Sequence, residues 1–443
     1  MLSSFPLLSR FKTDMSDKTM DTLLRVHIAP LLDLAGMSPD QAELRLEEAW
    51  KALVVPSTQM RLVIRKIATA AQQYSEAVYT DEKTFLRNVY APPLGGMSNF
   101  PICLTGLAGI GKSQIIAGFS RVYSTELSLV LPGHTDFSIS SAWHIAVRSD
   151  VGAKRLLGSK FRCGDGKCKS LEEATAESIK QGIAAICVDE FQFHTASDAN
   201  AKTAKLLLQL SSVGPPLVFA TNFSLLHKLY KRPHEERQRL FSKPILVVPD
   251  GSGSKDWGEY VVAALGVAPE FSELAMNSIA PEILHRYTFG IRRSVALLLK
   301  ISYSRMRIRK GGKVSMGDVE SAYNSLEYAS AREDVTLLVK GSINKSALTK
   351  DLYCPIKGIE MATPGGVAKH PAIQEHERRS GEEALKSSLT REEREAYESA
   401  SGSKTRRKSQ SAPPVKRPPA TASKLIDAAN RFLKHGIEKD PQS

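Results

Sequence analysis

The chain has 443 residues, of which 42% are hydrophobic and 24% charged, and its formal net charge is +13. The composition excludes a chain that is disordered throughout, and the absence of both a long apolar run and a secretory signal predicts a cytoplasmic protein. The excess of positive charge favours a phosphate-rich polymer as partner, although the same charge could serve solubility alone.

Residues 1–90 predict a helical N-terminal segment. Ser38-Pro39-Asp40 carries the residue types that open a helix, which would run over residues 41–53, and apolar residues at helical spacing predict another helix over 60–78. Pro56 separates the two helices. The Pro- and Gly-rich stretch that follows residue 90 ends the segment.

Residues 91–250 predict an α/β core with a parallel sheet. Apolar runs that lack alternate polar residues are typical of strands covered on both faces, and here they alternate with helical patterns. The expected strands are residues 100–105, 127–131, 183–188 and 217–221, with a further apolar run at 244–248, and the expected helices are residues 115–123, 171–181 and 201–210.

Residues 251–345 predict an all-helical lid domain, whose clearest pieces are residues 271–277, 281–285, 292–305 and 316–331. Residues 346–443 predict a largely disordered basic tail, because charged residues, Ser and Pro dominate there. Ser423 to His435 is the exception, since a short helix there would have one apolar face, formed by Leu425, Ile426, Ala429, Phe432 and Leu433. Such a helix is marginal alone, which suggests a docking peptide.

The strongest motif is Gly106-Leu107-Ala108-Gly109-Ile110-Gly111-Lys112-Ser113, which matches the phosphate-binding loop G-x-x-x-x-G-K-S between a strand and a helix. Its glycines would let backbone N–H groups curl around phosphate oxygens at the helix N-terminus. Lys112 would contact the β- and γ-phosphates of ATP, and Ser113 would ligate Mg²⁺. Gln114, the next residue, completes the expected nucleotide contacts.

Paired carboxylates, Asp189 and Glu190, follow the apolar run at residues 183–188. Asp189 would hold the magnesium through water, and Glu190 would orient and polarise the attacking water. The second acid therefore favours ATP hydrolysis over ATP binding alone. Two solvated acids at a strand end are the alternative, which the phosphate-binding loop upstream disfavours.

Polar and basic side chains further along complete the expected catalytic set. Asn222, at the tip of a predicted strand, could reach the γ-phosphate and the water, or could simply form a turn. Arg237 or Arg239 could project into a neighbouring subunit's nucleotide as an arginine finger, or lie solvated on a helix surface. Arg293, narrowly favoured over Arg292, lies in the first turn of a helix, where a bound phosphate would offset its unfavourable interaction with the helix dipole.

The five cysteines are odd in number and irregularly spaced, which argues against a disulfide framework. Cys163 and Cys168 could form half of a zinc site with His134 or His144. Turn residues explain the stretch between these two cysteines better, because structural zinc sites usually offer a second closely spaced ligand pair.

These pieces, in this order, resemble the AAA+ ATPases over about residues 91–335. Within AAA+, the chain is similar to the TnsC/TniB type, the ATPases that choose targets for DNA transposons. The narrower resemblance rests on Val54-Val55-Pro56-Ser57-Thr58-Gln59-Met60-Arg61, on Ala220-Thr221-Asn222 and on Thr288-Phe289-Gly290 before Arg293. It implies ATP and Mg²⁺ as cofactors, and homo-oligomeric rings or filaments around duplex DNA. Such assemblies bridge a target-selector protein to transposase subunits, and ATP hydrolysis disassembles them.

The resemblance also implies DNA contacts in the region after the second strand. Its basic residues are Lys154, Arg155, Lys160, Arg162, Lys167 and Lys169. Phosphate contacts from such a loop would be sequence-tolerant and would weaken steeply with salt, and a solvated surface loop is the alternative. Residues 137–143 are expected to belong to the same insertion as these DNA-contacting residues. The tail after residue 345 has no counterpart in the family, and transposase docking is assigned to it on plausibility alone.

Two other functions of the same fold stay open at this point. A replication initiator or helicase loader would need a separate duplex-reading domain, and the composition of residues 346–443 does not suggest one. A protein-remodelling AAA+ ATPase would have no DNA role, and the positive charge would then be incidental.

Overall fold

A computed structural model gives the fold of residues 5–11, 14–93, 100–123, 127–131, 133–134, 136–147, 152–161, 168, 170–189, 199–343, 349–356, 360–361 and 379. Contacts divide the chain into two units, residues 1–379 and 380–443, and all of the described residues belong to the first. The helix expected at residues 423–435 therefore lies outside the described residues. Over the described ranges, no helix has both the length and the hydropathy that a membrane crossing requires.

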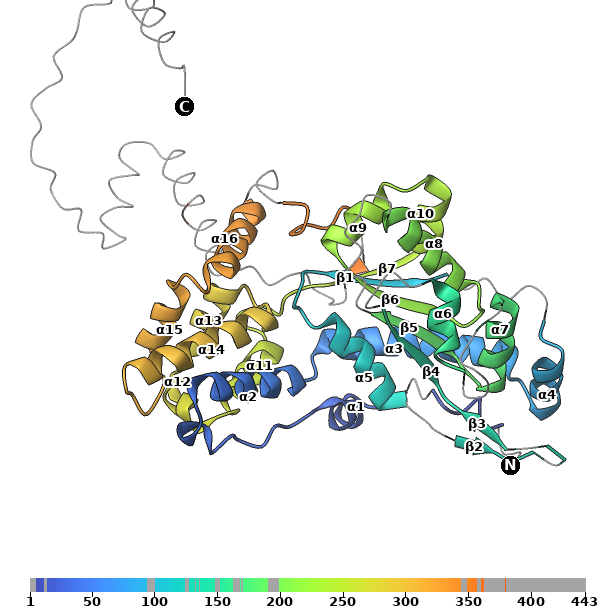
Figure 1. Ribbon diagram of the computed structural model, residues 1–443, viewed down its shortest axis with the longest axis horizontal. Coiled ribbons are helices and arrows are strands. Elements are labelled where there is room, and N and C mark those ends of the chain that lie inside the picture. Colours follow the sequence, from blue (N-terminus) through green and yellow to red (C-terminus); the bar gives the residue numbers. More distant parts are fainter. Residues whose placement is uncertain are drawn as a thin grey trace, which may run out of the picture. The chain divides into compact units, whose positions relative to one another are not determined.

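Six parallel strands form the central sheet, in the spatial order β4-β5-β6-β1-β7-β8 (Figure 1). The strands are β1 Ile102–Gly106, β4 Ala142–Ala146, β5 Ala185–Asp189, β6 Leu217–Asn222, β7 Lys243–Val247 and β8 Glu360–Met361. The middle strands β5, β6 and β1 are buried along almost their whole length because helices cover both faces, which explains their continuous apolar runs. The predicted α/β core with a parallel sheet is confirmed.

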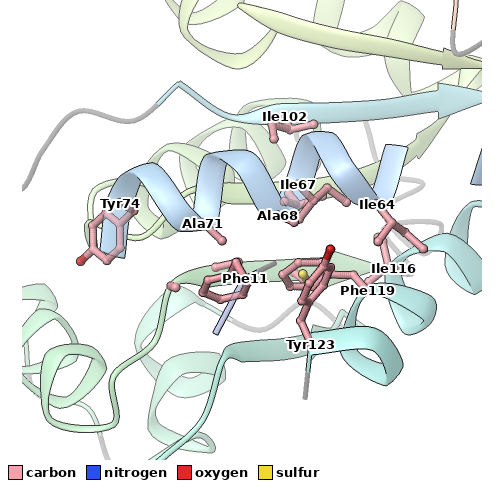
Figure 2. Packing of buried hydrophobic residues seen from close by; sticks show 14 of the residues in the cluster. Phe11, Ile64, Ile67, Ala68, Ala71, Tyr74, Ile102, Ile116, Phe119 and Tyr123 are labelled. Atoms are coloured by element: carbon pink, nitrogen blue, oxygen red, sulfur yellow. The ribbon is translucent and has the colours of Figure 1, made fainter. Parts of the chain in front are cut away.

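Helices cover the sheet on both faces. One face packs against α3 (Thr58–Val78), α5 (Lys112–Tyr123) and α1 (Asp17–Leu24). In this layer Ala68 and Ala71 of α3 lie opposite the rings of Phe11 and Phe119 (Figure 2). These two rings are stacked, and their centroids lie 6.1 Å apart. The other face packs against α6 (Ala153–Gly158), α8 (Ala199–Ser211) and α9 (Phe223–Tyr230). Three further helices of the core are α4 (Glu82–Tyr90), α7 (Leu171–Lys180) and α10 (His234–Leu240).

A second hydrophobic core joins the helices after the sheet to one helix from the start of the chain. Its members are α11 Lys255–Leu265, α12 Ser272–Met276, α13 Ala280–Thr288, α14 Arg292–Ile308, α15 Met316–Tyr323, α16 Ala329–Ile343 and α2 Pro39–Ala52. Ser38 and Gln41 form a capping box that starts α2, as the sequence suggests. Trp50 of α2 contacts Phe271 at 5.7 Å and donates its indole N–H to the carbonyl of Ala264 at 2.9 Å. The domain boundaries at residues 90, 250 and 345 stay predictions.

Residues 137–143, expected to belong to the DNA-contacting insertion, form parts of two strands, and only the second of these belongs to the central sheet. A DNA contact from this stretch stays a prediction. Part of this stretch is β3 (Phe137–Ile139), which pairs antiparallel with β2 (Leu127–Leu129) outside the central sheet. The rest opens β4, which is the neighbour of β5 in the central sheet. As an edge strand β4 buries only Trp143 and Ile145, so it lacks the continuous apolar run that predicts β1, β5, β6 and β7. The run at residues 127–131, expected as a strand of the parallel sheet, is instead β2 of the separate antiparallel pair.

One expected helix is in fact two. The apolar spacing over residues 316–331 predicts a single piece, but the structure ends α15 at Tyr323 and starts α16 at Ala329. The hydroxyl of Ser325 accepts the backbone N–H of Tyr328 in the turn between them. Apolar residues on either side of this turn face the same core, which is why the helical pattern continues across the break.

Phe119 tests the packing of the layer beneath the sheet. Its side chain is fully buried between α3, α5 and Phe11, so Phe119→Ala should lower the free energy of unfolding by about 3–5 kcal/mol. The matched control is Phe100→Ala, because Phe100 is 52% exposed and should change stability by less than about 0.5 kcal/mol. Urea unfolding followed by circular dichroism measures both, and equal effects would contradict this packing.

Candidate nucleotide-binding site

The phosphate-binding loop follows β1 and leads into α5, and its backbone geometry requires glycine at several positions. Gly109 and Gly111 have φ angles of 78° and 107°, which side chains rarely tolerate. A Cβ on Gly109 would lie 2.6 Å from Cβ of Arg293, and a Cβ on Gly106 would collide with the carbonyl oxygen of Val247. The loop is therefore held between β7 on one side and α14 on the other.

Lys112, the first residue of α5, folds back across this loop. Its ammonium donates to the carbonyl oxygens of Gly106 at 3.0 Å and Leu107 at 2.7 Å. Burial lowers the pKa of Lys112 to about 8, against the opposing effect of the Asp189 carboxylate. The amides of the first helical turn have no acceptor inside α5, so the loop presents an ammonium group together with backbone N–H donors.

A cavity of about 600 Å³ opens above the loop and brings together residues from distant parts of the chain. From the predicted nucleotide contacts it is lined by Ala108, Gly109, Gly111, Lys112, Ser113 and Gln114. Asp189, Asn222 and Arg293 line the same cavity. Gly106, Leu107 and Ile110 are buried behind it and form the inner side of the loop.

The oxygen donors in this cavity fit a magnesium ion. Ser113 offers a hydroxyl and Asp189 a carboxylate, and both are hard ligands of the kind Mg²⁺ prefers. In the described part of the chain no three His, Cys, Asp or Glu residues are grouped as metal ligands. Mg²⁺ suits such a sparse site, because it takes most of its ligands from phosphate and water. Glu190, the predicted base, lies outside the described residues.

Asn222 forms a cap and also lies at the cavity, and its role toward the γ-phosphate stays a prediction. β6 ends beside β1, with Asn222 paired to Gly106, so the side chain lies next to the phosphate-binding loop. Its oxygen accepts the backbone N–H of Leu225 at 2.9 Å and caps α9. The cap bond uses only the oxygen, which leaves the amide nitrogen to donate toward the cavity.

The structure separates the two arginines at the start of α14. Arg292 pairs with Asp250 at 3.2 Å and lies over the ring of Tyr260 at 4.9 Å. The backbone N–H of Arg293 donates to the carbonyl of Gly109 at 3.2 Å, and its side chain is exposed at the cavity. Both arginines line the cavity, but Arg292 is engaged by Asp250 and Tyr260, whereas the side chain of Arg293 is exposed there. Which of them meets a phosphate stays a prediction.

Arg237 and Arg239 lie on α10, and neither lines this cavity. Arg237 lies over the ring of Tyr230 at 4.9 Å. Arg239 lines an open groove between α8 and α10 together with Lys205 and Arg232. Their role toward a neighbouring subunit stays a prediction.

Half of the predicted DNA contacts fall on described residues. Lys154 and Arg155 are exposed on α6, and Lys160 is half-buried just after it, where burial lowers its pKa. Arg162, Lys167 and Lys169 lie outside the described residues, as does Cys163. Cys168 donates its thiol to the carbonyl of Ser170 at 3.0 Å.

One wall of the cavity has no recognisable motif in the sequence. Glu47, Trp50, Lys51 and Leu53 line it from α2 and the residue that caps this helix, opposite Lys300 of α14. Glu47 and Lys300 are 253 positions apart in the sequence, and no local motif marks either residue. The amphipathic pattern of α2 indicates only that one face of this helix packs against another element.

The strand order decides the fold class. The strand that ends in Asp189 is separated from the strand before the phosphate-binding loop by β6, which ends in the polar Asn222, and the order β4-β5-β6-β1-β7 is that of the AAA+ core. The chain has an AAA+ P-loop fold.

Comparisons with known proteins bear on this fold alone. No protein-family profile matches the sequence, and no curated protein matches it. Among solved structures, RuvB of Thermotoga maritima is 14% identical with a TM-score of 0.32, covering 63% of this chain and 76% of its own. Cdc6p of Pyrobaculum aerophilum is 12% identical with a TM-score of 0.35, covering 62% and 74%. ORC2 of Aeropyrum pernix is 11% identical with a TM-score of 0.36, covering 62% and 75%. At these values the neighbours say nothing about activity or partners, and the fold assignment rests on the strand order.

The lowered pKa of Lys112 predicts a pH dependence of nucleotide affinity. A triphosphate binds the ammonium form, and the free protein loses that proton as pH rises through about 8. Affinity should therefore be about tenfold weaker at pH 9 than at pH 7, with proton uptake on binding above pH 8. Isothermal titration in buffers of different ionisation enthalpy measures both quantities. Lys112→Ala should lose nucleotide binding. The control Lys83→Ala should keep it, because Lys83 is an exposed residue of α4. A nucleotide affinity that stays constant up to pH 9 would contradict the assigned contact.

Proposed function

We propose that this protein is a Mg²⁺-dependent ATPase. The observation that carries the proposal is the convergence of Lys112, Ser113, Asp189 and Arg293, from three separate stretches of the chain, on one cavity above a glycine loop. Backbone N–H groups of the loop and Lys112 would hold the β- and γ-phosphates. Ser113 and Asp189 would hold the metal, which supplies charge neutralisation between the phosphates.

The chain's own residues would carry out the remaining steps of hydrolysis. Glu190, directly after the β5 residue that lines the cavity, would orient and polarise the attacking water. The amide nitrogen of Asn222 would position that water or the γ-phosphate from the neighbouring strand end. Arg293 would stabilise charge on the γ-phosphate. Because it lies in the first turn of α14, it would also transmit the state of the nucleotide to this helix.

We further infer that the ATPase regulates DNA transposition, as the TnsC/TniB resemblance implies. In this proposal ATP-bound subunits assemble on duplex DNA and link a target-selector protein to a transposase, and hydrolysis releases them. The exposed cations Lys154 and Arg155, together with the net charge of +13, support a phosphate-rich partner. Arg237 or Arg239 would reach a neighbour's nucleotide, and the tail from residue 346 would dock the transposase.

Glu190→Gln tests the hydrolytic step. Losing the carboxylate should lower ATP turnover by about 100-fold or more while nucleotide binding stays intact, because binding depends on other groups. The variant should then accumulate as assemblies on DNA, which co-sedimentation and electron microscopy detect. Glu235→Gln on α10 is the matched control, since Glu235 is exposed and outside the cavity. Wild-type turnover in Glu190→Gln would remove the assigned role.

The double variant Lys154→Ala/Arg155→Ala tests the DNA contact. Removing two phosphate contacts should weaken duplex binding on every sequence and lower the slope of log affinity against log salt by about 2. Fluorescence anisotropy with a duplex at several salt concentrations measures the slope. Lys83→Ala/Arg87→Ala, which removes two exposed cations from α4, should leave it unchanged. Identical slopes for the two double variants would favour a protein-remodelling ATPase.

A further inference from the structure

The candidate nucleotide cavity continues past the phosphate-binding loop into a cleft between α2 and α14, which pack side by side (Figure 1). From α14 it is lined by Arg293, Ala296, Leu297 and Lys300, which share one helical face. From α2 it is lined by Glu47, Trp50 and Lys51, which also share one face. The two helices thus form opposite walls from the phosphate end outward.

The order of side chains along α14 matches the order of groups along a nucleotide. Arg293 lies at the loop, and Lys300 lies seven residues further, about 10 Å along the axis. Apolar Ala296 and Leu297 lie between them on the helix, and Leu53 lines the same cavity. If the phosphates lie at the loop, a flat base falls between these apolar walls, and its outer edge falls near Lys300.

A carboxylate is held at that outer edge. Glu47 accepts from Lys51 at 2.7 Å and from Lys300 at 3.0 Å, and these two hydrogen bonds keep its pKa below the usual value, so the group is ionised at neutral pH. An ionised carboxylate offers about four acceptor positions and no donor, so it can take a further N–H. The other carboxylate that lines the cavity, Asp189, lies at the phosphate end.

We propose that Glu47 selects the base of the bound nucleotide, favouring a purine with an amino group at position 6 over one with an oxygen there. The amino group of adenine would donate to the free lone pairs of Glu47. An oxygen at the same place would set two acceptors against each other beside a fixed negative charge. This inference rests on the proposed nucleotide site and adds a specificity-determining residue to it.

The experiment compares ATP with inosine triphosphate, which has oxygen at position 6 and no amino group at position 2. Isothermal titration of the full chain with Mg²⁺ gives the two dissociation constants. Wild type should bind ATP at least about tenfold more tightly than inosine triphosphate. Glu47→Ala should reduce this ratio of dissociation constants to about twofold or less. Glu43→Gln is the matched control on α2, because Glu43 bonds Ser304 and does not line the cavity, and its ratio should equal that of wild type.

A second variant separates base reading from helix packing. Lys300→Met removes the ion pair between α2 and α14 but leaves the Glu47 carboxylate beside Lys51, so the ratio should persist even if both affinities change. If Lys300→Met loses the ratio as Glu47→Ala does, or if Glu47→Ala keeps it, the inference is overturned while the nucleotide site stands. If wild type binds neither triphosphate, the proposed function itself fails.

Discussion

The contact between the phosphate-binding loop and the start of α14 is the constraint on which the site depends. The carbonyl of Gly109 accepts the backbone N–H of Arg293, and the two residues approach so closely that no side chain fits on the glycine. Because Gly106 is equally tight against Val247 of β7, the loop is fixed on both sides before any ligand adds contacts. A loop held in this way loses little entropy on binding, which is the condition under which backbone amides bind phosphate well.

The same contact places the helical part over the cavity, and α2 extends this arrangement. After α1 the chain leaves the layer on the sheet, forms α2, which packs against α14, and returns to this layer at α3. The outgoing and returning segments are joined by backbone hydrogen bonds between Val26 and Val54. The side chain of Gln59 holds the link after β7 with two hydrogen bonds to Val248, at 2.9 and 2.8 Å. A ligand that fills the cavity touches the loop, α2 and α14 at once, so its presence and its charge bear on how the two hydrophobic cores meet.

Features formed by contiguous residues can be predicted from the sequence, and features that depend on contacts between distant segments cannot. The loop from Gly106 to Ser113 is a contiguous motif, and the strands near it are buried on both faces, so composition alone identifies them. β4 could not be predicted as a strand in this way, because an edge strand buries only alternate residues. Glu47 carries no local signal because its partner Lys300 is distant in sequence. Adjacent Arg292 and Arg293 differ through contacts of Arg292 with Asp250 and Tyr260, which no local pattern reveals.

The two ends of the cavity differ in how their charged side chains are paired. At the α2 end Lys51 and Lys300 both contact the carboxylate of Glu47. At the loop end Lys112 and Arg293 lie close enough for Arg293 to lower the pKa of Lys112, and no ion pair of Arg293 is found among the described residues. Each end thus holds two cations and one carboxylate, and what differs is the contact between them. Glu47 is bonded to both of its cations, whereas Arg293 is left to meet an anion at the loop end, which is favourable for the proposed triphosphate. The position of Arg293 and the apolar side chains further along α14 are independent features, and both favour the proposed orientation of the nucleotide.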